Sequence, residues 1–193
     1  MDGLGARLPR AVLCSRNEHK LRELEAALPG WELELLDAHE YPPEEGASYY
    51  ENARAKAEFG RRVGPADAWV LGEDSGIEVA ALGGEPGIGS ARWSERPIED
   101  LLARLEGVDA RRARYVCELV ALSPGGDELR GTGVLEGRIG HEPRGSEGFG
   151  YDPIFVPDGE ERTVAELGNA WKRDHSHRAR AARALLELVA QSH

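Results

Sequence analysis

The sequence predicts a mixed α/β fold, in which helices flank a twisted sheet, and three observations lead to it. Short apolar runs at residues 11–15 and 68–71 are typical of buried strands. Two longer runs at residues 115–122 and 128–139 are joined by the turn sequence SPGG and predict a β-hairpin. Segments of helical spacing lie between and after these strands, and this order of elements is typical of a mixed sheet.

The helices are predicted from the spacing of apolar residues and from their ends. Leucines at helical spacing indicate a helix over residues 18–28, which the Pro-Gly pair at 29–30 would end. A strand with alternating polarity is expected next, at residues 31–36. Proline at the first position favours a helix over residues 97–105, and one apolar face predicts a C-terminal amphipathic helix over residues 178–191.

Three polar residues are predicted to start helices. Ser48 with Glu51, and Thr163 with Glu166, have the spacing of capping boxes. Ser176 stands where it can cap the C-terminal helix.

Length and composition indicate one domain over residues 1–193, with residues 1–10 as a loosely ordered extension. Hydrophobic residues make up 40% and charged residues 31%, as in ordinary globular proteins. No apolar run approaches the roughly 20 residues of a membrane span, and residues 1–10 lack the apolar stretch of a signal peptide. We therefore expect a cytoplasmic protein without a membrane partner. Cys14 and Cys117 lie in strand-like runs and are predicted to be buried free thiols.

The charge balance restricts the class of partner. A net charge of −11 argues against a nucleic-acid partner, because surfaces that bind nucleic acids are usually basic. An acidic chain can still bind one phosphate chain through a local basic pocket or a metal. Among 24 basic residues only Lys20, Lys56 and Lys172 are lysines. Since lysine and arginine are not interchangeable at phosphate sites, these three are candidate ligands, although an arginine bias of the genome would also explain their rarity.

The first polar motif joins the strand at 11–15 to the helix at 18–28. It consists of Ser15, Arg16, Asn17, Glu18, His19 and Lys20. The N-terminus of a helix offers free N–H groups and a partial positive charge, which together suit a phosphate. The alternative is an ordinary helix cap with a solvated lysine.

Two acidic motifs follow. Glu44 and Glu45 stand in a loop bounded by Pro and Gly, and carboxylates there could hold Mg²⁺, although a solvated acidic loop is more common. The run EDSG at residues 73–76 comes directly after the predicted strand at 68–71 and is expected to form a turn. Carboxylates at the end of a buried strand suit metal binding and the orientation of a water molecule. A polar turn without function is the alternative.

Two further motifs could recognise a nucleobase. The run GFGYDP at residues 148–153 predicts a tight turn that exposes two aromatic rings, which could stack on a base; a β-bulge with core aromatics is the alternative. Lys172 precedes Ser176, and His177 and Arg178 are donors that could meet a purine carbonyl. An exposed helix cap with two solvated side chains is the competing interpretation.

Several familiar motifs are absent from the sequence. It has no G-x-x-x-x-G-K-[ST] phosphate loop, no complete dinucleotide fingerprint and no G-x-S-x-G nucleophile elbow. The run RELE at residues 22–25 lacks the remainder of a Nudix box.

Taken in order, the motifs closely resemble the inosine triphosphate pyrophosphatase family, also called XTP/dITP diphosphatases. The matching runs are SRNEHKLREL, EEGASYYENARAKA, GEDSGIEVAALGGEPGIGSARW, PRGSEGFGYDPIFVP and AELGNAWKRDHSHR. The resemblance implies an elongated fold of two lobes with a central cleft, usually as a homodimer. It also implies Mg²⁺-dependent hydrolysis of ITP, dITP and XTP to the monophosphate and pyrophosphate.

The resemblance assigns roles to individual residues. Glu44 and Asp74 would bind the metal, and Asp74 would also be the proton acceptor. The substrate would be bound by Ser15, Arg16, Asn17, Glu18, His19, Lys20, Ser75, Phe149, Gly150, Tyr151, Asp152, Lys172, His177 and Arg178. The residues 15–20 would line the triphosphate, and His177 and Arg178 would contact the base.

The chain departs from the family pattern at two positions. Glu73 stands where the family usually has Asp, and Gly89 replaces a frequent Tyr. Glu45 is the alternative to Glu44 as metal ligand. Two other functions stay open: a nucleotide sensor without turnover, and a pyrophosphatase for modified pyrimidine nucleotides, dTTP or UTP.

Overall fold

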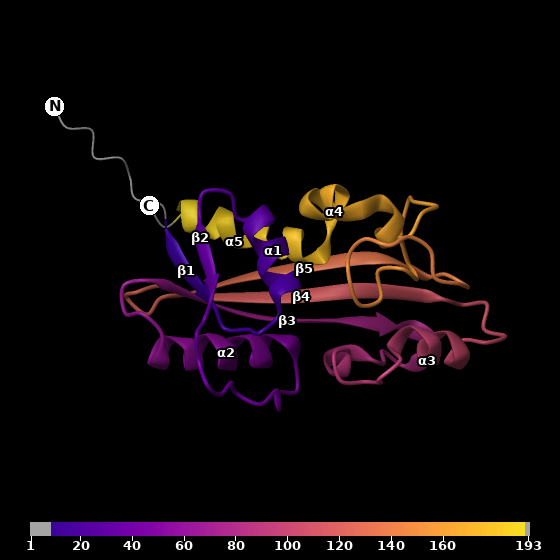
Figure 1. Ribbon diagram of the computed structural model, residues 1–193, viewed down its shortest axis with the longest axis horizontal. Coiled ribbons are helices and arrows are strands. Elements are labelled where there is room, and N and C mark those ends of the chain that lie inside the picture. Colours follow the sequence, from indigo (N-terminus) through magenta and orange to yellow (C-terminus); the bar gives the residue numbers. More distant parts are fainter. Residues whose placement is uncertain (1–8, 192–193) are drawn as a thin grey trace.

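The computed structural model describes residues 9–191, and one six-stranded sheet runs through it in the order β2-β1-β3-β4-β5-β6 (Figure 1). The strands are β1 (Arg10–Leu13), β2 (Glu32–Leu35), β3 (Trp69–Val79), β4 (Arg112–Leu122), β5 (Glu128–Ile139) and β6 (Phe155–Pro157). The helices are α1 (Glu18–Ala27), α2 (Tyr49–Val63), α3 (Pro97–Arg104), α4 (Val164–His175) and α5 (His177–Gln191), with 3₁₀ turns η1 (Ala80–Leu82) and η2 (Gly87–Gly89). The predicted mixed α/β class is confirmed. Of the expected N-terminal extension, residues 1–8 lie outside the described residues, and Arg10 already begins β1.

The sheet is parallel on one side and antiparallel on the other, and the change occurs at β3. β1 pairs in parallel with β2 and β3, and its pairing with β3 ends where Leu13 meets Leu71. β3 continues to Val79 as an antiparallel partner of β4. Beyond Leu71, no strand of residues 9–191 runs beside this edge of β3, and only an isolated bridge joins Glu78 to Pro86 there.

The predicted turn at residues 73–76 is wrong, because these residues lie inside β3. Glu73 pairs with Leu119 of β4 and Gly76 with Val116, so the polar run has a complete ladder partner on one side. Polar residues have weak strand propensity, but pairing with a neighbouring strand overrides it. The parallel pairing with β1 nevertheless ends at Leu71, just before the acidic run.

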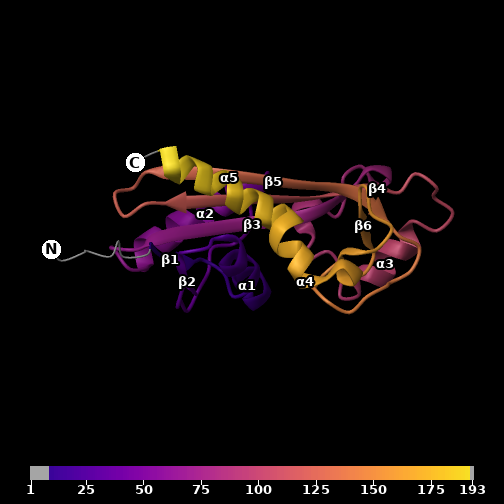
Figure 2. The same ribbon diagram turned by 90° about the horizontal axis from the view of Figure 1, so that it is seen from above.

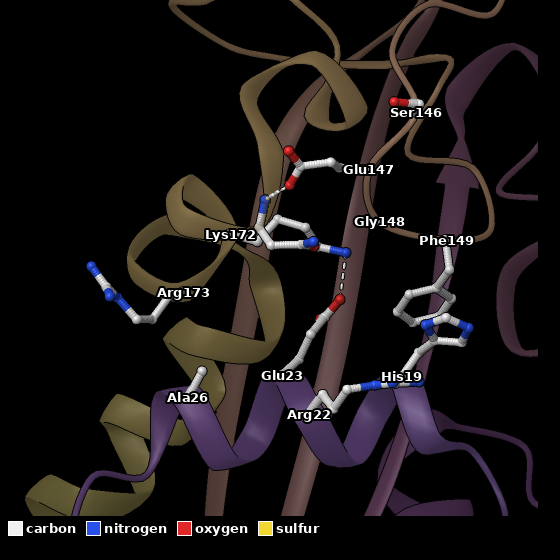
Figure 3. A pocket seen from close by; sticks show the side chains of 11 residues that line it. His19, Arg22, Glu23, Ala26, Ser146, Glu147, Gly148, Phe149, Lys172 and Arg173 are labelled. Atoms are coloured by element: carbon white, nitrogen blue, oxygen red, sulfur yellow. Dashed lines mark hydrogen bonds and ion pairs between the residues drawn. The ribbon is translucent and has the colours of Figure 1, made fainter.

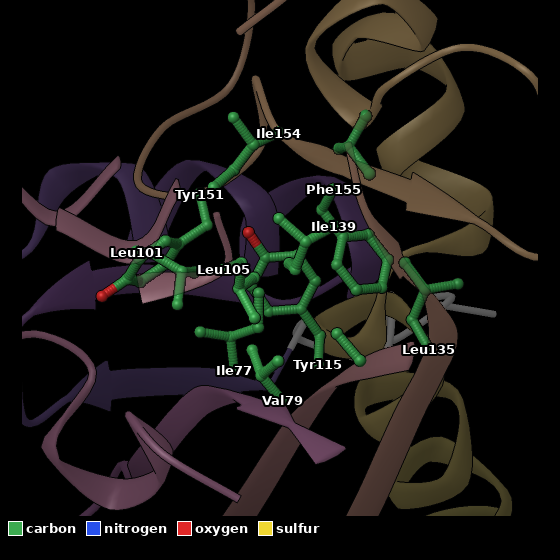
Figure 4. Close-up of a cluster of buried hydrophobic side chains, with 12 residues drawn as sticks. Ile77, Val79, Leu101, Leu105, Tyr115, Leu135, Ile139, Tyr151, Ile154 and Phe155 are labelled. Atoms are coloured by element: carbon green, nitrogen blue, oxygen red, sulfur yellow. The ribbon is translucent and has the colours of Figure 1, made fainter. Parts of the chain in front are cut away.

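The molecule is elongated (Figures 1 and 2). Its two largest hydrophobic clusters lie toward opposite ends of the long strands β3 and β4. α2 and α3 lie on one side of the sheet and α1, α4 and α5 on the other (Figure 1). One core contains Leu24 of α1, Leu71 of β3 and Leu185 of α5. The other contains Leu101 of α3 and Phe155 of β6 (Figure 4). This arrangement agrees with the two lobes that the family resemblance implied.

Local sequence signals were reliable at the helix ends. Thr163 and Glu166 form the complete predicted capping box. At α2 only half of the box is present: Ser48 accepts from the Glu51 N–H, but the Glu51 carboxylate accepts from the Ala47 N–H at 2.7 Å. The sequence interpretation did not include β6. Among residues 9–191, no helix is long and apolar enough to cross a membrane, and both cysteines are free and buried as predicted.

Two glycines of β5 allow α5 to pack directly on the sheet. A Cβ atom on Gly133 would lie 1.9 Å from the carbonyl oxygen of His177, and one on Gly131 would lie 2.1 Å from that of Ala181. Such distances are far below van der Waals contact, so any side chain here would push α5 outward. Because His177 begins α5, these glycines set the depth at which the start of α5 lies.

We predict that Gly133→Ala lowers the free energy of unfolding by about 1–3 kcal/mol, because overpacking displaces backbone. Urea unfolding followed by circular dichroism measures this value. Gly125→Ala in the β4–β5 turn is the matched control, since the nearest atom to its Cβ would be 3.6 Å away. The control is expected to change stability by less than about 0.5 kcal/mol. Equal losses in both variants would show that the helix contact is not the cause.

Candidate active site

The alternation of β3 sends the two neighbouring acids to opposite faces of the sheet. Asp74 faces α2, where Asn52 and Lys56 donate to its carboxylate. Glu73 and Ser75 face the other side, where both accept from Arg178 of α5. The expectation that the acidic run offers two carboxylates to one metal is therefore wrong for the side chains: Asp74 alone points to the side where Glu44 lies.

Asp74 and Glu44 meet at a single ammonium group. The Lys56 Nζ lies 3.1 Å from Asp74 Oδ1 and 3.0 Å from the backbone oxygen of Glu73, and it also pairs with the Glu44 carboxylate. Arg92 pairs with the second oxygen of Glu44. The side chain of Asp74 is only 4% exposed, so Lys56 and its neighbours cover it from the cleft.

Asn52 ties the loop that carries Glu44 to β3. Its amide donates to Asp74 Oδ2 at 3.0 Å, and its oxygen accepts from the Gly46 N–H at 2.8 Å. Asn52 and Lys56 are one turn apart on α2, so both reach the same carboxylate. Glu45, the alternative metal ligand, is exposed.

On the other face, six side chains of alternating charge form a continuous ion-pair chain. It runs through Lys20, Glu73, Arg178, Glu23, Lys172 and Asp152. Glu73 lies 2.6 Å from Lys20 and 3.0 Å from Arg178. Burial alone would raise the pKa of Glu73, but Lys20 and Arg178 outweigh it and hold this pKa well below its ordinary value. Glu73 is therefore a buried carboxylate anion.

The second half of the ion-pair chain connects α1 to α4. Glu23 lies 2.5 Å from Arg178 and also pairs with Lys172 (Figure 3). Lys172 lies 2.6 Å from Asp152, which also accepts from the Tyr115 hydroxyl at 3.1 Å. Burial raises the pKa of Asp152 despite the nearby ammonium of Lys172, whereas Arg178 and Lys172 outweigh burial at Glu23 and lower its pKa.

Two adjoining cavities occupy the cleft and share Asn17 and Ala91. The larger, of about 1100 Å³, is the charged cavity, lined by Ser15, Arg16, Asn17, Glu18, His19, Lys20, Glu44, Lys56 and Arg92 among others. The smaller, of about 260 Å³, is the aromatic cavity, lined by Ser75, Tyr115, Phe149, Gly150, Tyr151, Asp152, Lys172, His177 and Arg178 among others. All three lysines of the chain therefore line the cleft, and the predicted substrate-binding residues fall into one charged and one aromatic part.

Phe149 forms a wall of the aromatic cavity. Its ring stacks on His19, with centroids 5.0 Å apart, and the Lys172 ammonium lies 4.8 Å from the ring centre. A third cavity of about 480 Å³ lies against the same pair of rings (Figure 3). The expectation of two exposed aromatics is wrong for Tyr151, which is buried in the hydrophobic core while its hydroxyl donates to the Ser90 carbonyl. The turn ends in Ile154 and Phe155, whose burial draws Tyr151 inward.

The start of α5 is buried, so the interpretation as an exposed cap is wrong. Ser176 caps the helix by accepting from the Ala179 N–H at 3.1 Å. Arg178 uses three of its five N–H groups on Glu73, Glu23 and Ser75. The Nη2 that donates to Ser75 also lies 3.0 Å from Glu73 Oε1, so at most two N–H groups of Arg178 have no acceptor among the described residues.

His177 is a neutral imidazole at the floor of the aromatic cavity. Its ring stacks on Tyr115 with centroids 4.5 Å apart, and its Nδ1 has no hydrogen-bond partner among the described residues. Burial, followed by the charges of Arg178 and Lys172, holds the pKa of His177 well below its ordinary value.

This lowered pKa predicts a pH-dependent stability. Below about pH 6.5 the unfolded chain protonates His177 but the folded chain does not. The unfolded state then binds more protons than the folded state. The free energy of unfolding therefore decreases as the pH is lowered, by up to about 1.4 kcal/mol per pH unit from this group. Urea unfolding of wild type and His177→Asn between pH 8 and pH 5 measures the difference. The variant is expected to have the flatter profile, and parallel profiles would contradict the buried neutral imidazole.

Sequence reasoning missed three residues of the site: Tyr115 lines the aromatic cavity, Asn52 donates to Asp74, and Glu23 pairs with Arg178 and Lys172. Two of them carried a usable signal: Asn52 lies four residues before Lys56, and Glu23 lies three residues after Lys20, so each shares a helix face with a flagged lysine. Tyr115 carried no such signal, because an aromatic residue in a strand is usually part of the core.

Fold and cleft together define an elongated α/β protein with a charged cavity joined to an aromatic one. Residues 11–188 match the model of the Ham1 family. A protein of Deinococcus deserti named dITP/XTP pyrophosphatase is 42% identical over 191 residues, which cover 95% of this chain and 91% of the relative. One of Symbiobacterium thermophilum with the same name is 45% identical, with coverage of 93% and 94%. The solved structure of the Staphylococcus aureus Ham1 protein superposes with a TM-score of 0.83 at 32% identity, covering 95% of this chain and 100% of that chain.

The chain belongs to the Ham1 family. The resemblance drawn from the ordered motifs is thereby confirmed.

Proposed function

We infer that the chain hydrolyses non-canonical purine nucleoside triphosphates, ITP, dITP and XTP, to the monophosphate and pyrophosphate. The observation that carries this inference is the pair of adjoining cavities: one lined by cations and carboxylates, the other by an aromatic ring and buried donors. A triphosphate fits the first and a purine base the second. The names of the relatives support the same reaction.

We propose Mg²⁺ as the cofactor, held by Glu44 and Asp74. Both carboxylates point at the single ammonium of Lys56, so a cationic position lies between them. Over residues 9–191, no group of three or more His, Cys, Asp or Glu side chains converges. Two carboxylates fit Mg²⁺, which commonly takes one or two of them and completes its shell with water and phosphate oxygens. When bound, it supplies positive charge against the phosphates.

Different residues of the site would bind the phosphates and activate the water. Lys20 and Arg92 neutralise the phosphate oxygens, which matters because the chain as a whole is acidic. Asp74 orients the attacking water and accepts its proton. The water attacks phosphorus in line and pyrophosphate leaves; positioning and charge stabilisation supply most of the rate in such transfers.

Selection of the base would follow from the donors of the aromatic cavity. Hypoxanthine and xanthine have a carbonyl at C6, whereas adenine has an amino group there. The N–H groups of Arg178 that have no protein acceptor would match a carbonyl, and adenine would leave them unpaired in a buried place. Phe149 lines the same cavity and would contact the base through its ring.

We further propose that the protein is a cytoplasmic homodimer, on the basis of the family resemblance. Sedimentation velocity over a range of concentrations tests the dimer: a single monomer boundary at micromolar concentration would contradict it.

The test of the function is kcat/KM for ITP, XTP, dITP, GTP, ATP and dTTP with Mg²⁺, with release of pyrophosphate and monophosphate measured directly. We expect ITP, XTP and dITP to exceed the others, and chelation of divalent cations to stop turnover. Binding of ITP without pyrophosphate release would favour the sensor instead. A preference for dTTP would favour the pyrimidine enzyme.

A further inference from the structure

Glu73 lies between the two halves of the cleft but reaches neither. Its side chain is 0% exposed, and it lines none of the cavities found among the described residues. It stands at the position where the family usually has Asp. A fully buried carboxylate is expensive unless its partners compensate the charge, so its partners indicate what it does.

Each oxygen of Glu73 pairs with a cation from a different half of the cleft. Oε2 lies 2.6 Å from the ammonium of Lys20, which lines the charged cavity. Oε1 accepts from Nε of Arg178 at 3.0 Å, and Arg178 lines the aromatic cavity. The Cys117 thiol also donates weakly to Oε1, at 3.5 Å. Glu73 therefore connects α1 to α5 through β3.

The two cations depend on Glu73 to different degrees. Glu73 is the carboxylate that pairs with Lys20, whereas Arg178 also pairs with Glu23 and donates to Ser75. Without the charge of Glu73, Lys20 and Arg178 would lose the anion between them and would repel each other. Lys20 could turn toward the solvent of the open cavity, and the guanidinium of Arg178 would lose one of its fixed acceptors.

We propose that Glu73 is a positioning residue that holds Lys20 and Arg178 at one fixed separation, so that the phosphate chain and the base are recognised by one rigid unit. This inference rests on the proposed function, in which Lys20 meets phosphate and Arg178 meets the base. It gives Glu73 a role distinct from that of its neighbour Asp74, which faces the opposite side of the sheet.

The test uses Glu73→Gln with one readout for each half of the cleft. The affinity for tripolyphosphate, measured by calorimetry with Mg²⁺, reports on the phosphate half. The ITP/ATP ratio of kcat/KM reports on the base half. We expect Glu73→Gln to lower both by about tenfold or more, since the variant loses the ion pair with Lys20 and the charge that strengthens the hydrogen bond from Arg178. Lys20→Met should lower chiefly the tripolyphosphate affinity, and Arg178→Lys chiefly the ratio.

Glu118→Gln is the matched control. Glu118 is a buried carboxylate on the adjacent strand β4 that pairs with Arg130 and accepts from Thr132, outside both cavities. A loss caused only by removing a buried ion pair would appear in both glutamine variants. We expect Glu118→Gln to reduce the melting temperature while both readouts stay within twofold of wild type.

The inference is overturned if Glu73→Gln changes only one readout or neither. Should this variant fail to fold, Glu73→Asp carries the test, because it keeps the charge but withdraws the carboxylate by about 1.5 Å, one carbon–carbon bond. Both readouts should again fall, by less than in Glu73→Gln, and a wild-type value of either would refute the shared positioning. A wild-type protein that does not hydrolyse ITP would instead refute the proposed function, so the two failures are distinguishable.

Discussion

Asp74→Asn is expected to lower kcat for ITP by about 10²–10⁴-fold, the usual contribution of general acid–base catalysis, while the affinity for ITP stays close to that of wild type. The asparagine keeps the shape of the side chain but loses its ability to accept a proton, and it loses the charge with which Asp74 and Glu44 would hold Mg²⁺. No other residue in the proposed function accepts the proton of water, so the loss should fall on kcat.

The local hydrogen bonds sharpen this expectation. In wild type one oxygen of Asp74 accepts from Lys56 and the other from Asn52. An asparagine has one oxygen and one NH₂ group, so one of these two donors must lose its acceptor whichever way the amide is turned. We therefore expect a measurable decrease in melting temperature as well as the loss of kcat.

Steady-state kinetics and ITP calorimetry on the variant test the assignment. Glu118→Gln serves again as the control for loss of a buried carboxylate, and it should keep wild-type kcat. A kcat for Asp74→Asn within tenfold of wild type would exclude Asp74 as the proton acceptor.

Arg178→Lys is expected to lower the ITP/ATP ratio of kcat/KM by about 10–100-fold, because an unpaired buried group costs about 1–3 kcal/mol. Lysine keeps the positive charge beside Glu73 and Glu23, so the fold should persist. It cannot reproduce the planar fork that reaches Glu73, Glu23 and Ser75 and still presents free N–H groups to the cavity. We therefore expect Arg178→Lys to lose the discrimination between a carbonyl and an amino group at C6 while the protein stays folded.

The comparison with Arg178→Ala separates recognition from stability. Alanine leaves two buried carboxylates short of a cation, and breaking a buried pair in this way commonly costs about 3–5 kcal/mol. We expect Arg178→Ala to be strongly destabilised and Arg178→Lys to melt much closer to wild type. An unchanged ITP/ATP ratio of kcat/KM in a folded Arg178→Lys protein would show that Arg178 does not select the base.

Local sequence signals predicted most of the helices and strands and many of the residues that line the two cavities. Pro and Gly end helix α1, Thr163 caps α4, and the SPGG turn joins β4 to β5, because each signal acts over a few residues of backbone. The three lysines were flagged by their rarity, and all three line the cavities. The ordered motifs also sufficed to recognise the family.

The tertiary structure alone decided which side chains act together. Glu73 and Asp74 are neighbours in sequence, yet β3 sends them to opposite faces because β4 supplies a strand partner about 45 positions later in the chain. Arg178 meets Glu23 across 155 positions of sequence. Such contacts depend on strand register and helix depth, which the close approach at Gly133 helps to set. No local pattern encodes them, and they make Asp74 the candidate for chemistry and Glu73 the residue that holds the site together.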